Sequence, residues 1–182
     1  MTVIPIEDLM QSAHRIFTQR EATLESEAAD RSVADLKQTV LTMRRMLSAA
    51  AAGLPESAYE RQPDDIDGND VWSAGEIASH IAGTMIWTDA NVRKITGQPE
   101  SLPSDELAQY ADVRVRTKTE SLETLKVADR ELHRILDGIP ENVDTSATID
   151  HDTFGTVGVK GWLLLTALHE GDHANQLREL GG

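Results

Sequence analysis

The chain has 182 residues, which favours one compact domain with room for an added arm, and 40% of them are hydrophobic, enough to form a core. Asp and Glu number 31 against 17 Lys and Arg, and the resulting net charge of -14 argues against a basic surface for nucleic acid or an anionic membrane. The absence of cysteine excludes disulfides, thiolate metal ligands and cysteine nucleophiles.

Residues 1–31 are predicted to form an N-terminal helical arm, because the segment from about Pro5 to Asp30 is rich in Glu, Ala and Gln. The first twenty residues lack the basic and then apolar order of a signal peptide. Along the chain, no apolar run approaches the roughly 18 to 20 residues of a membrane span. We therefore expect a soluble, cytoplasmic protein whose main domain occupies residues 32–182.

Two helices with clear boundary signals are expected in the first half of this domain. Ser32 is a predicted N-cap, and the apolar stripe that follows ends at Gly53 and Pro55. The acidic stretch 56–70, with Pro63 and Gly68, is predicted to be a loop. Ser73 and Glu76 then form a predicted capping box, and the second helix ends at Gly97. The two stripes are Val33, Leu36, Val40, Met43, Leu47 and Ala50, and Ile77, Ile81, Met85, Thr88, Val92 and Ile95.

Two further helices are expected in the second half. One runs from Pro103 or Ser104 to Gly138, where Pro140 prevents its continuation, and the other from about Thr156 to Leu180. Between them, residues 141–155 are polar and have room for a short extended piece. The run 162–168 is apolar on more than one face, which predicts packing against two neighbours or a dimer contact. Four long amphipathic helices predict an all-α, four-helix bundle, and its two long loops allow connections other than up-down-up-down.

Three of the six histidines lie on core-facing stripes, where unpaired imidazoles are costly. His169 and His173 are four residues apart on the last helix, and His80 faces inward on the second helix. The i, i+4 spacing lets two side chains converge on one cation, to which His80 would add a third nitrogen. Three imidazoles bind Zn, Ni, Fe or Cu and leave room for water or substrate, so the sequence predicts a metal site.

Three other interpretations of these histidines are weaker. The segment 169–173 reads HEGDH, a zinc-protease signature, but only nine residues follow His173, too few for a downstream ligand element. A di-iron bundle needs two Glu-x-x-His pairs, and the chain has one, Glu170 with His173. A bundle whose histidines are merely hydrogen-bonded stays open.

In its histidine motifs the chain resembles the DinB-like (damage-inducible) superfamily, which includes bacillithiol transferases and mycothiol-dependent maleylpyruvate isomerases. The resemblance rests on Trp72-Ser73-x-x-Glu76-x-x-x-His80 in the second helix and on His169-x3-His173-x2-Gln176 in the last. It covers roughly residues 32–180 and leaves the arm outside.

The resemblance implies an up-down-down-up bundle in which His80, His169 and His173 hold one divalent metal ion, Zn or Ni, with Fe as a further candidate. It also implies an S-transferase, isomerase or hydrolase that acts on a small molecule with a low-molecular-weight thiol, and often a homodimer, in a bacterial stress response. The alternative is a non-catalytic module in which the ion only stabilises the bundle, its coordination closed by Asp150, Asp152 or Glu76.

Other residues near the histidines have two interpretations each. Glu76 accepts the second ring N–H of His80 or acts as the capping-box carboxylate, and Gln176 bonds a ligand or a facing helix. Glu170 is interpreted as a solvated or inter-helix charge. His151 and Phe154 line the pocket mouth or belong to a solvated loop, whereas His14 and His133 are expected at the surface.

Overall fold

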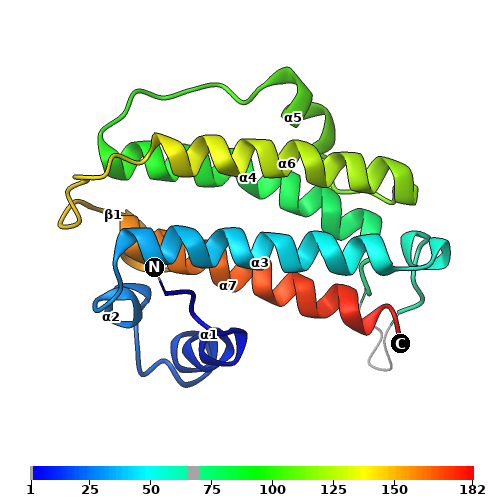
Figure 1. Cartoon of the computed structure of the whole chain (residues 1–182), viewed down its shortest axis with the longest axis horizontal. Helices are drawn as coiled ribbons and strands as arrows, with labels where there is room; N and C mark the ends of the chain where they lie inside the picture. Colours follow the sequence, from blue (N-terminus) through cyan, green and yellow to red (C-terminus); the bar gives the residue numbers. More distant parts are fainter. Residues whose placement is uncertain (1, 65–69) are drawn as a thin grey trace.

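The structure, a computed structural model, describes residues 2–64 and 70–182, so Gly68 of the predicted loop lies outside the described residues. Four long helices form a bundle, with shorter elements at its ends and on two opposite sides (Figure 1). The long helices are α3 (Val33–Gly53), α4 (Ala74–Thr96), α6 (Lys118–Gly138) and α7 (Val159–Glu179). The short ones are α1 (Ile6–Ala13), the π-helix η1 (His14–Gln19), α2 (Leu24–Ala28), the 3-10 helix η2 (Glu56–Tyr59) and α5 (Asp105–Tyr110). The predicted all-α fold is confirmed.

The long helices begin where side chains cap them. The hydroxyls of Ser32 and Ser73 accept hydrogen bonds from the backbone N–H groups of Asp35 and Glu76, which confirms both predicted helix starts. Ser73 and Glu76 form the predicted capping box, and Thr117 with Glu120 forms another at the start of α6. Gly97 ends α4 in the left-handed conformation.

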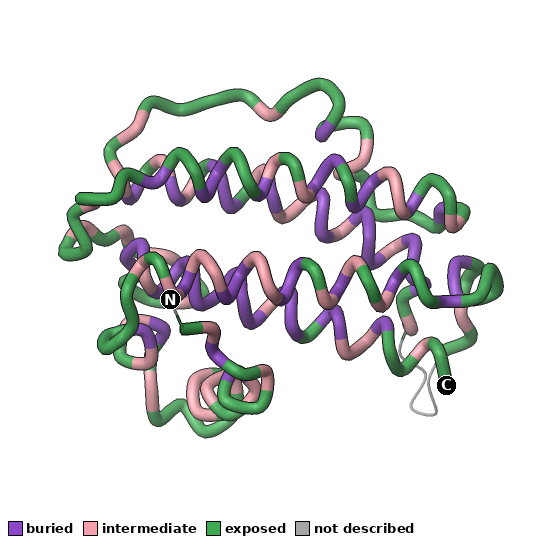
Figure 2. Tube along the Cα trace, in the orientation of Figure 1, coloured by how far each residue is buried: buried purple, intermediate pink, exposed green. Residues whose placement is uncertain are grey.

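Contacts between side chains define the directions of the helices in the bundle. Leu54, which follows α3, lies beside Gly181, which follows α7, and Asp89 pairs with Arg134 near the ends of α4 and α6, so each of these two helix pairs is parallel. His80 contacts His169, and Trp87, two turns further along α4, contacts Trp162, nearer the start of α7, so the two pairs are mutually antiparallel. Figure 1 shows the long connection after α4 returning along the bundle to the start of α6. The buried residues line the inward faces of the four helices (Figure 2).

The prediction of one helix from residue 103 or 104 to Gly138 is wrong, because residues 111–117 separate α5 from α6. This segment lies against small residues on α4. The Nε of Arg116 donates a 2.8 Å hydrogen bond to the hydroxyl of Ser79, and a Cβ on Gly75 would lie 2.6 Å from the backbone nitrogen of Arg116. Val115, an apolar residue of this segment, is exposed. Close packing of residues 111–117 on α4 therefore takes the place of a continuous helix between α5 and α6.

The predicted helical arm is not one continuous helix, because Arg20 takes a left-handed conformation (φ 57°) between η1 and α2. Its helices pack on α7. The Oε1 of Glu25, in α2, accepts hydrogen bonds from the backbone N–H groups of Gly158 (2.7 Å) and Gly161 (3.0 Å). Since α7 has no side-chain cap of its own, the arm caps the helix that carries two of the histidines. The domain boundary after residue 31 stays a prediction.

The last helix begins at Val159 and not near Thr156, because the preceding residues form a hairpin. Strand β1 (Thr148–His151) pairs antiparallel with β2 (Gly155–Gly158), with Ile149 opposite Val157. The extended piece expected within 141–155 is thus β1. The apolar run 162–168 is buried within the chain, between α3, α4 and the arm. Within the described residues, no helix is both long and apolar enough to cross a membrane.

Candidate metal centre

His80, His169 and His173 form one cluster between α4 and α7, which we call the three-histidine cluster. The Nε2 atom of His169 lies 2.9 Å from the Nε2 of His80 and 3.1 Å from the Nε2 of His173. One nitrogen from each ring lies within 4.8 Å of the other two. The antiparallel crossing of α4 and α7 thus brings together residues that are 89 positions apart in the sequence, and the three side chains could hold a metal ion.

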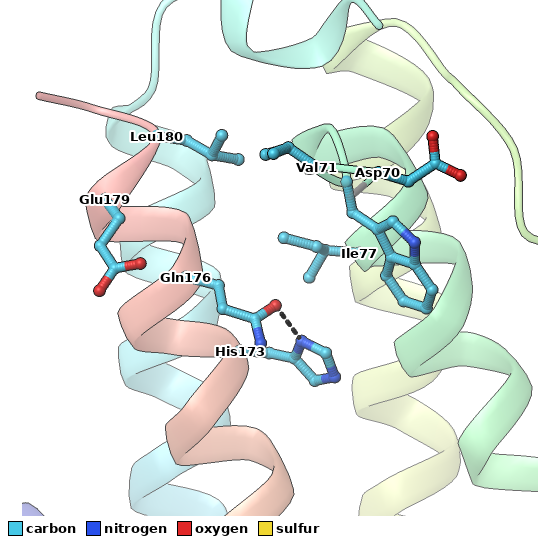
Figure 3. Close-up of a pocket in the computed structure, with 8 residues that line it drawn as sticks. Asp70, Val71, Ile77, His173, Gln176, Glu179 and Leu180 are labelled. Atoms are coloured by element: carbon cyan, nitrogen blue, oxygen red, sulfur yellow. Dashed lines mark hydrogen bonds between the residues drawn. The ribbon is translucent and has the colours of Figure 1, made fainter. Parts of the chain in front are cut away.

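A short chain of hydrogen bonds sets the orientation of His173. The Nε2 of Gln176 donates to the carboxylate of Asp172 at 2.9 Å, so its Oε1 faces the Nδ1 of His173 at 3.0 Å (Figure 3). An amide oxygen only accepts, so Nδ1 carries the proton and the lone pair of Nε2 faces the cluster. Of the two interpretations of Gln176, the bond to a histidine of the cluster is the one found.

Burial keeps the imidazoles of the cluster neutral. Burial first, and the neighbouring histidines second, lower the pKa of His80 to about 4 and that of His169 to about 3. The pKa of His173 is also lowered by burial, although its hydrogen bond with Gln176 acts in the opposite direction. Neutral imidazole nitrogens that converge are the donor set preferred by Zn and other late divalent ions, so the residues present fit such an ion.

A pocket of about 500 Å³ opens beside His173 at the C-terminal end of α7. Its walls come from the N-terminal part of α4, the residues before it and the end of α7 (Figure 3). Trp72 stacks parallel to the ring of His173, with centroids 6.4 Å apart, and contacts His80 edge to face at 4.9 Å. The lining is mixed and consists of Asp70, Val71, Trp72, Ile77, His173, Gln176, Glu179 and Leu180.

The carboxylates proposed to close the coordination are engaged elsewhere or exposed. Glu76 accepts hydrogen bonds from the N–H and hydroxyl of Ser73, at 2.8 and 2.9 Å, which supports its interpretation as a capping residue. Asp150 accepts from Thr156 across the hairpin, and Asp152 is exposed. Among residues 2–64 and 70–182, no carboxylate joins the three-histidine cluster.

Glu170 points away from the cluster and is completely buried between α7 and α3. Its Oε2 accepts from the Nε of Arg44 at 2.8 Å, and its Oε1 pairs with the Nη2 of the same guanidinium. Both carboxylate oxygens are therefore occupied, which supports the inter-helix interpretation. The same contacts weigh against the protease interpretation, in which this glutamate would activate a water molecule.

Two apolar pockets lie on the other side of the cluster and are both lined by His169 and Phe154. His151 packs edge to face on Trp87, with centroids 5.2 Å apart, so the hairpin lies on aromatic side chains and is not a solvated loop. His14 and His133 are exposed, as predicted.

Several residues of this site were not predicted from the sequence. Asp172 is one turn before Gln176, so the i, i+4 spacing that revealed the histidine pair could have revealed this contact as well. No local signal identifies Arg44 as the partner of Glu170, since the two are 126 positions apart. Trp87 and Phe17 are exposed aromatic residues, and only the tertiary structure places them beside the cluster.

The chain matches the family model of the DinB superfamily over residues 39–177, a span that contains all three histidines. It matches no curated protein and no solved structure at the significance required of a relative. The matched span begins within α3 and leaves the arm outside, as the resemblance of the two histidine motifs indicates. The chain belongs to the DinB superfamily.

Proposed function

We propose that the chain is a metal-dependent enzyme of the DinB superfamily that acts on a small molecule. His80, His169 and His173 would hold one divalent ion, Zn or Ni, with Fe as a further candidate. The observation that carries the proposal is the convergence of three Nε2 atoms, with separations of 2.9 and 3.1 Å from the Nε2 of His169. A homodimer is part of the same proposal and derives from the family resemblance alone.

An ion at this site would lower the pKa of bound water or of a bound thiol and so supply a nucleophile. Around it, Gln176 holds the Nε2 lone pair of His173 toward the cluster, and Trp72 covers the rings of His80 and His173. The pocket of about 500 Å³ beside His173 leaves room for a polar co-substrate such as a low-molecular-weight thiol. The reaction proposed is therefore thiol-dependent transfer, isomerisation or hydrolysis.

Elemental analysis of the untagged protein tests the metal site. We expect about one equivalent of Zn, Ni or Fe, and its loss in the His169→Ala, His173→Ala double variant, because one remaining imidazole binds such ions weakly. The matched control is His133→Ala, an exposed histidine on α6 that should leave the metal content unchanged. No metal in the wild type, even after reconstitution with several ions, would overturn the proposal.

Cobalt substitution separates an enzyme from a non-catalytic module. If the coordination is open, an added thiol should change the visible spectrum of the Co²⁺-loaded protein, because it enters the coordination shell. A spectrum that no thiol or other small ligand changes would indicate a closed, structural ion. If a thiol does change the spectrum, turnover would be sought among reactions that depend on that thiol.

A further inference from the structure

Exposed aromatic side chains gather around the three-histidine cluster. The chain has only two Phe, three Trp and two Tyr. Among the described residues, Phe17, Trp72 and Trp87 are the aromatic residues with large exposed areas, at 45%, 36% and 42%. Each of them lines a pocket that also contains His169 or His173. Exposure of large apolar groups costs free energy in water, and their concentration at one site indicates a ligand.

The arm forms one wall of an apolar pocket that reaches His169, which we call the arm-side pocket. It has a volume of about 340 Å³ and is lined by Met10, Ala13 and Phe17 of the arm, Phe154 of the hairpin, and Leu165 and Leu168 of α7. His169 and Asp172 complete the lining. This volume is in the range of sites that bind small molecules.

A smaller apolar pocket adjoins the arm-side pocket and shares three of its residues, Phe154, Leu165 and His169. Aromatic contacts connect the two. Phe154 lies 6.2 Å from Phe17 on one side and 6.2 Å from Trp87 on the other, measured between ring centroids. Phe154 thus separates two apolar spaces that both end at one histidine of the cluster.

The charges around the arm-side pocket disfavour an anionic ligand. Within the described part of the chain, no Lys or Arg lines it or the adjoining pocket, and the charged group at its rim is the carboxylate of Asp172. The net charge of the chain, -14, adds to the same repulsion. An uncharged group with a large apolar surface is repelled neither by Asp172 nor by the net charge, and it would cover the exposed ring of Phe17.

We propose that the arm-side pocket binds the uncharged aromatic, or similarly bulky apolar, part of the substrate beside His169, with Ala13 and Phe17 as specificity-determining residues. That this ligand is a substrate rests on the proposed function, whereas its binding depends only on the pocket. The arm, which lies outside the part of the chain that matches the superfamily, would then select the substrate of this member.

Binding of N-phenyl-1-naphthylamine, an uncharged fluorescent probe, tests this inference on the full chain as purified and after metal removal. We expect saturable binding in both forms. Phe17→Ala should weaken it about five- to tenfold, since an aromatic wall is lost, and Ala13→Phe should abolish it by filling the pocket. Phe17 is partly exposed, so its truncation should leave the fold intact. The matched control is Leu102→Ala, which removes an apolar side chain that is 91% exposed and lies outside both apolar pockets.

Two further measurements give the location of the probe. Trp72→Ala, on the opposite pocket, should leave its affinity unchanged, and in histidine side-chain NMR spectra the probe should shift His169 and leave His133 unmoved. Equal affinity in wild type, Phe17→Ala and Ala13→Phe would overturn the inference, as would weaker binding in Trp72→Ala alone. If the probe binds but the protein never holds metal, the inferred pocket is supported and the proposed metal-dependent enzyme is contradicted. Failure of this inference and failure of the proposed function are therefore distinguishable.

Discussion

Adjacent residues of α7 point in different directions and have different tasks. His169 turns its imidazole toward the three-histidine cluster, and Glu170 turns its carboxylate into the interface with α3, where Arg44 pairs with it. The side chains of Arg44 and Glu170 are 1% and 0% exposed, respectively. Because a buried charge without its partner is far more costly than a buried pair, this contact holds α7 in one position relative to α3.

The Glu170→Gln variant should lower the free energy of unfolding by about 3–5 kcal/mol, since it leaves the Arg44 guanidinium buried without a counter-charge. Urea unfolding measures this loss. The comparison is Glu123→Gln, which breaks the exposed ion pair with Lys126 and should change stability by less than about 1 kcal/mol. Equal stability of the two variants would contradict the assigned role of the buried pair.

Gln176 is predicted to act through His173 on metal affinity. Gln176→Leu removes the acceptor for the Nδ1–H of His173 and should weaken metal binding about 10- to 100-fold, a typical effect of losing such a partner. Competition with a chelator of known affinity measures the change.

Exchange of the two hydrogen-bonding groups provides the control. In the double variant Gln176→Glu, Asp172→Asn, the new carboxylate at position 176 accepts from the Nδ1–H of His173, and the new amide at position 172 donates to that carboxylate. Most of the metal affinity should therefore return. If Gln176→Leu binds the metal as tightly as wild type, the tautomer assignment of His173 is wrong.

At the scale of elements, a row of small residues on α4 receives the connection that leads to α6. Gly75, Ser79 and Gly83 follow one another at intervals of four residues, and all three contact or closely approach residues 111–116. This close approach lets the backbone of the connection lie on α4 without large side chains between them. It also explains why the segment cannot continue as the helix that its composition suggests.

Gly75→Ala should destabilise the protein by about 1–3 kcal/mol, because the added Cβ would lie 2.6 and 2.7 Å from the backbone N and O of Arg116. Gly138→Ala is the matched control, since a Cβ there meets no atom within 4 Å. Thermal unfolding of both variants checks the prediction. A Gly75→Ala protein as stable as Gly138→Ala would show that the connection moves away from α4 at no cost.

For the whole molecule, the stability of the metal-free protein should fall in acid. The folded state holds His80 and His169 neutral, with pKa values of about 4 and about 3, whereas the unfolded chain protonates them near pH 6.5. The unfolded state therefore binds more protons below pH 6.5. The stabilisation is complete above that pH and is lost as the pH falls toward 4 and 3, with a slope of at most about 1.4 kcal/mol per pH unit for each histidine.

Denaturant unfolding at pH 7, 6 and 5 measures this dependence. The metal-free His80→Gln, His169→Gln variant should lose less stability over that interval than wild type, and His133→Gln should behave as wild type because the residue is exposed. Identical pH profiles for wild type and the double variant would show that the folded protein protonates the cluster without cost.

Features that depend on neighbours in the chain were accessible from the sequence. Hydroxyl and carboxylate groups cap a helix within three residues, so Ser32 and Ser73 predicted the starts of α3 and α4 correctly. The spacing of His169 and His173 placed them on one face of α7 in the same way. The fold class and the superfamily followed from these local signals.

Features that depend on distant partners were decided only by the tertiary structure. The break between α5 and α6 is favoured by contacts with Gly75 and Ser79, and the burial of Glu170 depends on Arg44, 126 positions away. The arm reaches α7 through Glu25, and Phe17 reaches the pocket beside His169. Periodicity and capping report the free energy of single helices, whereas these contacts arise from the packing of helices against one another, which the sequence of each helix alone does not contain.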